Sequence, residues 1–169
     1  LEVALKEAYK KLSNKKIKTA LIDSELLLAN SIKKSREFII LNSDYDISTR
    51  EYNNFQEMVS QRFNGKPIAY LINKKFFWKY DFFINDKVLI PRPDTEIIIE
   101  QVIKLTKNKS KYNVLDIGVG SGCIILSILK EKKNFRGTGI DISKKTLRIC
   151  KINSDNLGVS NRLKLFKSD

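Results

Sequence analysis

The sequence contains no histidine, and this absence removes several kinds of active site at once. A chain without histidine has no histidine general base, no Ser-His-Asp triad and no histidine metal ligand. Cysteine is scarce: Cys123 and Cys150 stand singly, without the spacing of a metal site. We therefore predict no metal centre, and we expect two reduced thiols, as is usual in a cytoplasmic protein.

Long apolar runs are also lacking. No uninterrupted apolar stretch approaches the roughly 20 residues that span a bilayer, and no signal peptide is visible. Hydrophobic residues make up 42% and charged residues 30% of the 169 residues, as in a folded protein of one domain or two small ones. We predict no membrane segment and a cytoplasmic location.

Acidic residues are few relative to basic ones, so the net charge is +13. Residues 1–73 hold 12 basic and 9 acidic residues, whereas residues 74–169 hold 20 and 10. Such basicity is typical of nucleic-acid-binding proteins, but the lysines are scattered and form no stripe interleaved with aromatic residues. Lysine, asparagine and isoleucine are abundant, while glycine and proline are scarce. The three abundant residues have A/T-rich codons, so a bias in genome composition is an alternative explanation of the positive charge. Nucleic acid is thus an alternative partner that we do not favour.

The first 72 residues carry helical patterns, with apolar residues recurring at helical spacing. Ser48 and Glu51 have the spacing of a capping box, and Gly65 and Pro67 end the helix that this box begins. We expect a small helical bundle. Its predicted helices cover residues 1–12, Ala20–Ile32, a short stretch from Ser35, and the segment from Ser48 to Gly65.

The character of the sequence then changes. Aromatic residues predict two short β-strands, Lys75–Trp78 and Tyr80–Ile84. From Pro93 or Asp94 onward, helices alternate with strands, which predicts a parallel sheet with right-handed crossovers. The expected helices run from Pro93 or Asp94 to Leu105, over Cys123–Lys130, and from Ser143 to about Asn156. The expected strands are Asn113–Ile117, Phe135–Ile140 and Leu163–Phe166.

The loop between the first of these parallel strands and its helix reads GVGSG, from Gly118 to Gly122. A glycine-rich turn at this place lets a ligand approach the backbone, and the helix N-terminus offers N–H groups to an anion. The next strand leads to Asp141, about 20 residues on, where a carboxylate typically accepts ribose hydroxyls. Together these features predict a ligand that contains a nucleoside.

Asp116 stands at the mouth of the loop and favours one ligand class. The spacing is GxGxG rather than the GxGxxG of dinucleotide sites, and a pyrophosphate would meet a carboxylate of like charge. S-Adenosylmethionine carries an ammonium, a sulfonium and a single carboxylate, so it suits both the aspartate and the helix N-terminus. We predict this cofactor, and we keep a NAD-dependent oxidoreductase as an alternative. The predicted cofactor-binding residues are Asp116, Gly118, Val119, Gly120, Ser121, Gly122, Asp141 and, against the adenine, Asp169.

Five stretches together resemble the HemK-type, PrmC-like release-factor glutamine methyltransferases. They are IAYL at residues 68–71, FW at 77–78, LIPRPDTE at 89–96, LDIGVGSG at 115–122 and DIS at 141–143. The resemblance implies an α/β chain: a helical release-factor-docking domain over residues 1–72, a β-hairpin linker over 73–92, and over 93–169 part of a class I S-adenosylmethionine-dependent methyltransferase domain with a Rossmann-like sheet.

The same resemblance implies methylation of the side-chain amide nitrogen of the glutamine in the GGQ tripeptide of peptide chain release factors. Near the methionine end of the cofactor, or near the substrate, it implies Arg92, Pro93, Thr95 and Glu96. Helix initiation is the alternative role of Asp94 and Glu96. The catalytic motif of the family, Asn-Pro-Pro-Tyr, does not occur in this sequence, and we expect it beyond Asp169. No catalytic residue is therefore assigned, and we expect the chain alone to be inactive.

Three further alternatives stay open. The same kind of catalytic motif serves methylation of amino groups on nucleic-acid bases, which would use the basic charge. A glutamine of a ribosomal protein is a closer alternative substrate, and a non-catalytic fragment that only binds a partner is the third. Since the expected fourth strand is absent from the sequence, the strand 113–117 would lack a neighbour, and we expect poor solubility or oligomers.

Overall fold

The structure is a computed structural model that describes residues 1–106 and 110–168. The chain divides into two compact units, Leu1–Ile72 and Asn73–Asp169. The predicted linker 73–92 falls within the second unit, and its standing as a separate segment remains a prediction.

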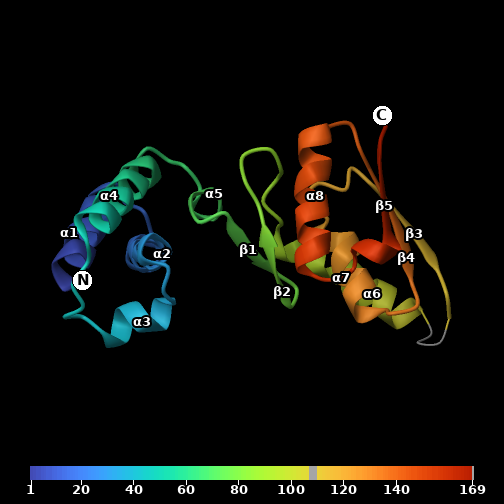
Figure 1. Cartoon of the computed structure of the whole chain (residues 1–169), viewed down its shortest axis with the longest axis horizontal. Coiled ribbons are helices and arrows are strands. Elements are labelled where there is room, and N and C mark those ends of the chain that lie inside the picture. Colours follow the sequence, from blue (N-terminus) through green and yellow to red (C-terminus); the bar gives the residue numbers. More distant parts are fainter. Residues whose placement is uncertain (107–109, 169) are drawn as a thin grey trace. The chain divides into compact units, whose positions relative to one another are not determined.

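The first unit is helical, as the periodicity predicts (Figure 1). Its core holds Leu12 of α1, Leu27 and Leu28 of α2, and Phe55 and Val59 of α4, all fully buried. These apolar residues recur at helical spacing, so each helix turns one face inward. The helices are α1 (Glu2–Asn14), α2 (Ala20–Ile32), α3 (Arg36–Leu41), α4 (Thr49–Phe63) and α5 (Ile68–Leu71).

The predicted capping box begins α4. The N–H of Glu51 donates to the Ser48 hydroxyl, and the N–H of Ser48 donates to the Glu51 carboxylate. Gly65 follows the helix with a φ of +95°, a conformation that glycine adopts readily. The short helix α5 was not predicted, because we took Pro67 only as a helix end, whereas it also caps the next turn.

The second unit begins with an antiparallel hairpin and continues with a three-stranded parallel sheet of order β3-β4-β5. This alternation of strands and helices confirms the α/β fold class predicted from the sequence. The elements are β1 (Lys74–Phe77), β2 (Tyr80–Phe83), the 3-10 turn η1 (Pro93–Thr95), α6 (Glu96–Leu105), β3 (Asn113–Ile117), α7 (Cys123–Glu131), β4 (Arg136–Asp141), α8 (Lys144–Asn156), the 3-10 turn η2 (Ser160–Arg162) and β5 (Leu163–Lys167).

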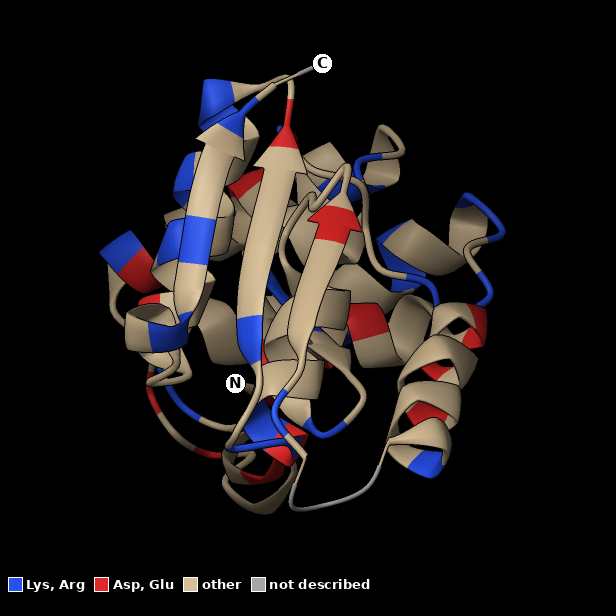
Figure 2. Ribbon diagram, turned by 90° about the vertical axis from the view of Figure 1, so that its right-hand side faces the viewer, with Lys and Arg blue, Asp and Glu red and all other residues tan. Residues whose placement is uncertain are grey.

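Helices α7 and α8 pack on one face of this sheet. Gly137 of β4 lets α7 lie close to the sheet, because a Cβ at this position would lie 2.8 Å from Ile125 Cδ1 of α7. Figure 2 turns the opposite face of the three strands toward the viewer. On that face Leu115, Ile117 and Phe166 are 57%, 77% and 53% exposed, so part of it is apolar and uncovered among the described residues.

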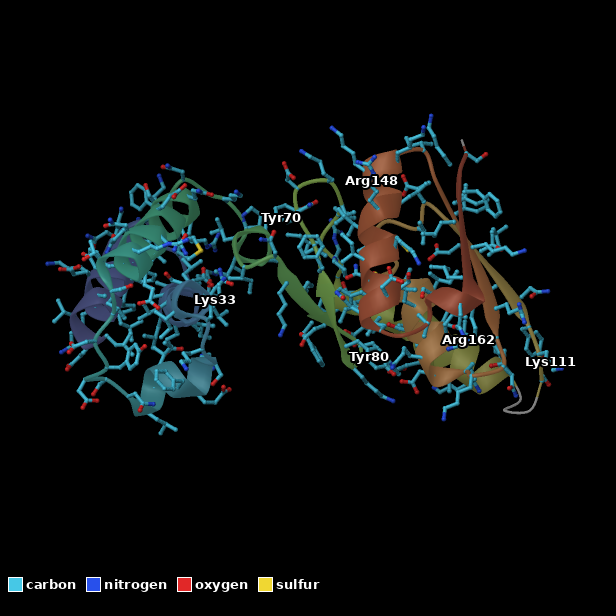
Figure 3. The ribbon with its side chains drawn as sticks, viewed as in Figure 1. Lys33, Tyr70, Tyr80, Lys111, Arg148 and Arg162 are labelled. Atoms are coloured by element: carbon cyan, nitrogen blue, oxygen red, sulfur yellow. The ribbon has the colours of Figure 1, made fainter. Side chains whose placement is uncertain are left out.

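Arg162 binds the backbone at the C-terminal end of α7 (Figure 3). Its guanidinium donates to the carbonyls of Leu129, Lys132 and Phe135, at distances of 2.6, 3.1 and 3.1 Å. These carbonyls belong to the last turn of α7 and the residues after it, which otherwise lack helical partners. Arg162 thereby fixes α7 relative to β4 and β5.

Candidate functional site

The glycine loop joins the carboxyl end of β3 to the start of α7. The N–H groups of Gly118 and Val119 both donate to the Ile140 carbonyl of β4, each at 2.9 Å. The loop is therefore fastened to the neighbouring strand at the edge where parallel strands end. Ligands of open α/β sheets bind at this edge.

The three loop glycines all have positive φ, at +75°, +56° and +81°, but their surroundings differ. A Cβ on Gly118 would meet nothing within 4 Å, and one on Gly120 only the Gly118 carbonyl oxygen at 3.8 Å. A Cβ on Gly122 would lie 2.7 Å from Cys150 Sγ and 2.8 Å from Leu126 Cδ1. Gly122 is thus needed for packing of the loop against α7 and α8. Gly118 and Gly120 leave bare backbone, the arrangement that lets a cofactor lie against a loop.

Asp141 ends β4 and reaches the loop. Its Oδ2 accepts the N–H of Gly120 at 3.2 Å, and its Oδ1 accepts the N–H of Ser143 at 2.9 Å. The two features that the sequence predicts to meet, the glycine loop and this acid, do lie together. The carboxylate is half-buried and has lone pairs left for further donors such as ribose hydroxyls.

Asp116 has a role that sequence reasoning missed. Burial raises the pKa of this carboxyl, while a hydrogen bond from the Ile125 N–H acts in the opposite direction. Ile125 is the third residue of α7, and its N–H has no acceptor within the helix. The helix starts after Gly122, which has no side chain to cap it, so the Asp116 carboxylate offers negative charge to the positive end of α7. The sequence did hold a signal for this role: a carboxylate at the end of a strand, followed by a helix whose N-cap position is a glycine.

The two cysteines lie beside this acid as free thiols. Burial raises the pKa of Cys123 to about 11 and that of Cys150 to about 12, and the negative charge of Asp116 adds to both shifts. Both sulfurs are therefore protonated at neutral pH and are weak nucleophiles.

The segment from Arg92 to Glu96 begins α6 through the turn η1. The N–H of Thr95 donates to the Arg92 carbonyl at 3.1 Å, and Pro93 occupies the first position of the turn. The Glu96 carboxylate accepts the N–H of Trp78 at 2.9 Å and so holds the hairpin. A place for these residues at the methionine end of a cofactor stays a prediction.

Asp169, predicted to face the adenine, lies outside the described residues. The strand before it ends beside Asp141, since the N–H of Ser168 donates to the Asp141 carbonyl at 3.2 Å.

Two negative findings concern the described ranges 1–106 and 110–168. No helix in them is both long and apolar enough to cross a membrane. No group of three or more histidine, cysteine, aspartate or glutamate residues in them could hold a metal ion.

Two family models match this chain. Residues 3–72 match the model described as PrmC N-terminal domain, and residues 108–169 match one described as methyltransferase domain. The second match includes the glycine loop and Asp141, which the structure brings together.

Curated relatives are similar along most of the chain. The release factor glutamine methyltransferase of Buchnera aphidicola subsp. Schizaphis graminum is 38% identical over 93% of this chain and 56% of its own length. The proteins of the same name from Leptospira interrogans and Clostridium acetobutylicum are each 36% identical, over 98% of this chain and 58% of theirs. The chain thus spans a little over half the length of these relatives.

Solved structures show partial likeness. YjhP from E. coli is 26% identical with a TM-score of 0.39, over 47% of this chain and 31% of its own. A methyltransferase from Geobacter sulfurreducens, crystallised with S-adenosyl-L-homocysteine, is 27% identical with a TM-score of 0.38, over 46% and 30%. The chain is thus similar to a PrmC N-terminal domain over residues 3–72, to a methyltransferase domain over residues 108–169, and along most of its length to proteins named release factor glutamine methyltransferase.

Proposed function

We propose that this chain is part of an enzyme that methylates the glutamine of the GGQ tripeptide in peptide chain release factors, with S-adenosylmethionine as donor. One observation carries the proposal: a PrmC N-terminal domain match and an open glycine loop at the end of β3 occur in the same chain. The shared name of the relatives supports the substrate, since they are called release factor glutamine methyltransferases.

The residues at the loop fit this cofactor. Gly118 and Gly120 offer backbone without side chains, Asp141 offers acceptors for ribose hydroxyls, and Asp116 supplies negative charge at the end of β3. When bound, S-adenosylmethionine supplies a methyl group on a sulfonium. The negative charge of Asp116 near the start of α7 makes a pyrophosphate less favourable there than a ligand with cationic groups.

The chemical step depends on positioning. An amide nitrogen is a poor nucleophile, since its lone pair is delocalised, so it must be held in line with the methyl group. Among this chain's residues, those of the glycine loop and Asp141 bind and orient the donor. The residues that hold the glutamine amide are not assigned, because Asn-Pro-Pro-Tyr does not occur in the sequence.

The helical unit would dock the release factor, and the protein would act in the cytoplasm. The match of residues 3–72 to the PrmC N-terminal domain supports the first statement. The two free thiols support the second, because such cysteines are typical of reducing compartments.

A second candidate, methylation of a nucleic-acid base, is favoured by one observation. Residues 74–169 carry 20 basic and 10 acidic residues, a charge suited to a phosphate backbone. A methyl-transfer assay separates the two candidates, because labelled protein and labelled nucleic acid can be recovered and counted separately.

The test is methyl transfer from labelled S-adenosylmethionine by the protein expressed from the complete reading frame that encodes this chain. We expect label in a bacterial release factor, and none in the same factor with the glutamine of GGQ changed to alanine. Label in RNA or DNA with none in the factor would support the second candidate and overturn the first.

A further inference from the structure

Asn153 of α8 joins two parts of the second unit that are distant in sequence. Its Nδ2 donates to the Ser121 carbonyl of the glycine loop and to the Phe83 carbonyl of β2, each at 2.9 Å. Its Oδ1 accepts the N–H of Phe83 at 2.7 Å. One side-chain amide therefore bonds both backbone groups of the last β2 residue, as a neighbouring strand would, and also holds the loop.

These bonds use the whole hydrogen-bonding capacity of the amide hydrogens, and the bond to the Ser121 carbonyl is buried. Asn153 is 1% exposed and Ser121 is 3% exposed. Without the amide, the buried Ser121 carbonyl would lose this partner, which is unfavourable. An aspartate of the same shape would lose both donors, and a leucine would lose all three bonds. The position thus requires an asparagine rather than any residue of that size.

The loop needs such an external bond. Glycines permit many backbone conformations, so GVGSG does not define one conformation by itself. Two side chains restrain it: Asp141 at the Gly120 N–H, and Asn153 at the Ser121 carbonyl. Asp141 is half-buried beside the open backbone and can reach a ligand, whereas Asn153 is enclosed and acts only through the loop.

We propose that Asn153 is a positioning residue that couples the β1–β2 hairpin to the glycine loop, so that the hairpin and the cofactor affect one another. The functional part of this inference rests on the proposed binding of S-adenosylmethionine at the loop. Coupling is reciprocal by thermodynamic necessity: cofactor that orders the loop also orders Phe83, and displacement of the hairpin weakens cofactor binding.

Three versions of the 169-residue chain test the coupling: the wild type, Asn153→Leu and Phe135→Leu. Phe135→Leu is the matched control, because Phe135 is equally buried but precedes β4, at the opposite end of the sheet from the loop. Amide hydrogen exchange is measured first without ligand. We expect Asn153→Leu to speed exchange at the loop amides 118–122 as well as at Phe83, and Phe135→Leu to leave both unchanged. Faster exchange at Phe83 alone would overturn the coupling.

S-Adenosylhomocysteine titrations on the same proteins, at a temperature where all are folded, give the functional readout. We expect it to bind Asn153→Leu about tenfold more weakly than wild type, and Phe135→Leu with wild-type affinity. In wild type the ligand should slow exchange at Phe83, and in Asn153→Leu it should not. Equal affinities in all three proteins would overturn the positioning role. A wild type that binds no ligand but shows the coupled exchange would contradict the proposed function while leaving the coupling in place.

Discussion

The indole Nε1 of Trp78 donates to Oε1 of Glu131 at 2.9 Å, which ties the turn of the hairpin to the last residue of α7. The same carboxylate accepts the Tyr80 hydroxyl at 3.1 Å and pairs with the Lys79 ammonium at 3.0 Å (Figure 3 labels Tyr80). Trp78 itself has a φ of +60°, an uncommon conformation for a bulky residue. Its contacts with Glu131 and Glu96 hold it there.

This cluster predicts a loss of hairpin anchoring in acid. Burial alone would raise the pKa of Glu131, but hydrogen bonds from Trp78, Lys79 and Tyr80 outweigh burial and hold it below the ordinary 4.5. A lowered carboxyl pKa contributes stability above the unfolded value, and this stability is lost as pH falls through the folded value. Trp78 is the only tryptophan, so its fluorescence reports the change. We expect a transition below about pH 4.5 that is absent in Glu131→Gln. The same transition in both proteins would contradict this assignment.

Gly122→Ala should destabilise the second unit far more than Gly118→Ala. Both glycines have positive φ, so both changes cost about 1–2 kcal/mol in backbone strain. Only the Cβ at position 122 would also overlap Cys150 and Leu126, which adds about 1–3 kcal/mol. Thermal unfolding of the two variants measures the difference. Equal melting temperatures would show that the loop does not pack against α8 as described.

The first unit depends on a buried ion pair between Asp23 of α2 and Arg62 of α4. The atoms Oδ2 and Nε lie 2.7 Å apart, and the side chains are 4% and 19% exposed. Arg62→Met leaves the aspartate charge without its partner, so we expect a loss of about 3 kcal/mol in unfolding free energy. Lys74→Met, which breaks an exposed pair with Asp81, is the control and should change stability little. Denaturant titration compares them, and a small loss in Arg62→Met would contradict the account.

The uncovered face of the sheet predicts self-association. Leu115, Ile117 and Phe166 form an exposed apolar surface, and β3 has one strand neighbour among the described residues. Exposed edges and apolar patches promote pairing between chains. We expect the 169-residue chain to elute above its monomer mass of 19.5 kDa in size-exclusion chromatography, and Ile117→Lys to shift it toward monomer. A sharp wild-type monomer peak would refute this prediction.

Local patterns determined what the sequence could predict. The helix Ala20–Ile32, the capping box at Ser48 and the strand Asn113–Ile117 depend on periodicity and neighbouring residues, and the structure has all three as predicted. The predicted strand Phe135–Ile140 is displaced by one residue, to Arg136–Asp141.

The missed features are contacts between distant residues. Trp78 and Glu131 are 53 positions apart, and Phe83 and Asn153 are 70 apart. No spacing rule relates such pairs, since the fold alone brings them together. The meeting of the glycine loop with Asp141 was predictable because parallel strands end at a common edge.

The most direct test of the account is calorimetric titration of the chain with S-adenosylhomocysteine and with NADH. Gly120→Ala and Gly158→Ala are the matched variants, because both glycines have positive φ and little around their Cβ positions, but only Gly120 lies in the loop. We predict that S-adenosylhomocysteine binds wild type and Gly158→Ala alike, that Gly120→Ala weakens binding about tenfold or more, and that NADH does not bind. Tighter binding of NADH, or binding of S-adenosylhomocysteine unaffected by Gly120→Ala, would contradict the assignment of the glycine loop.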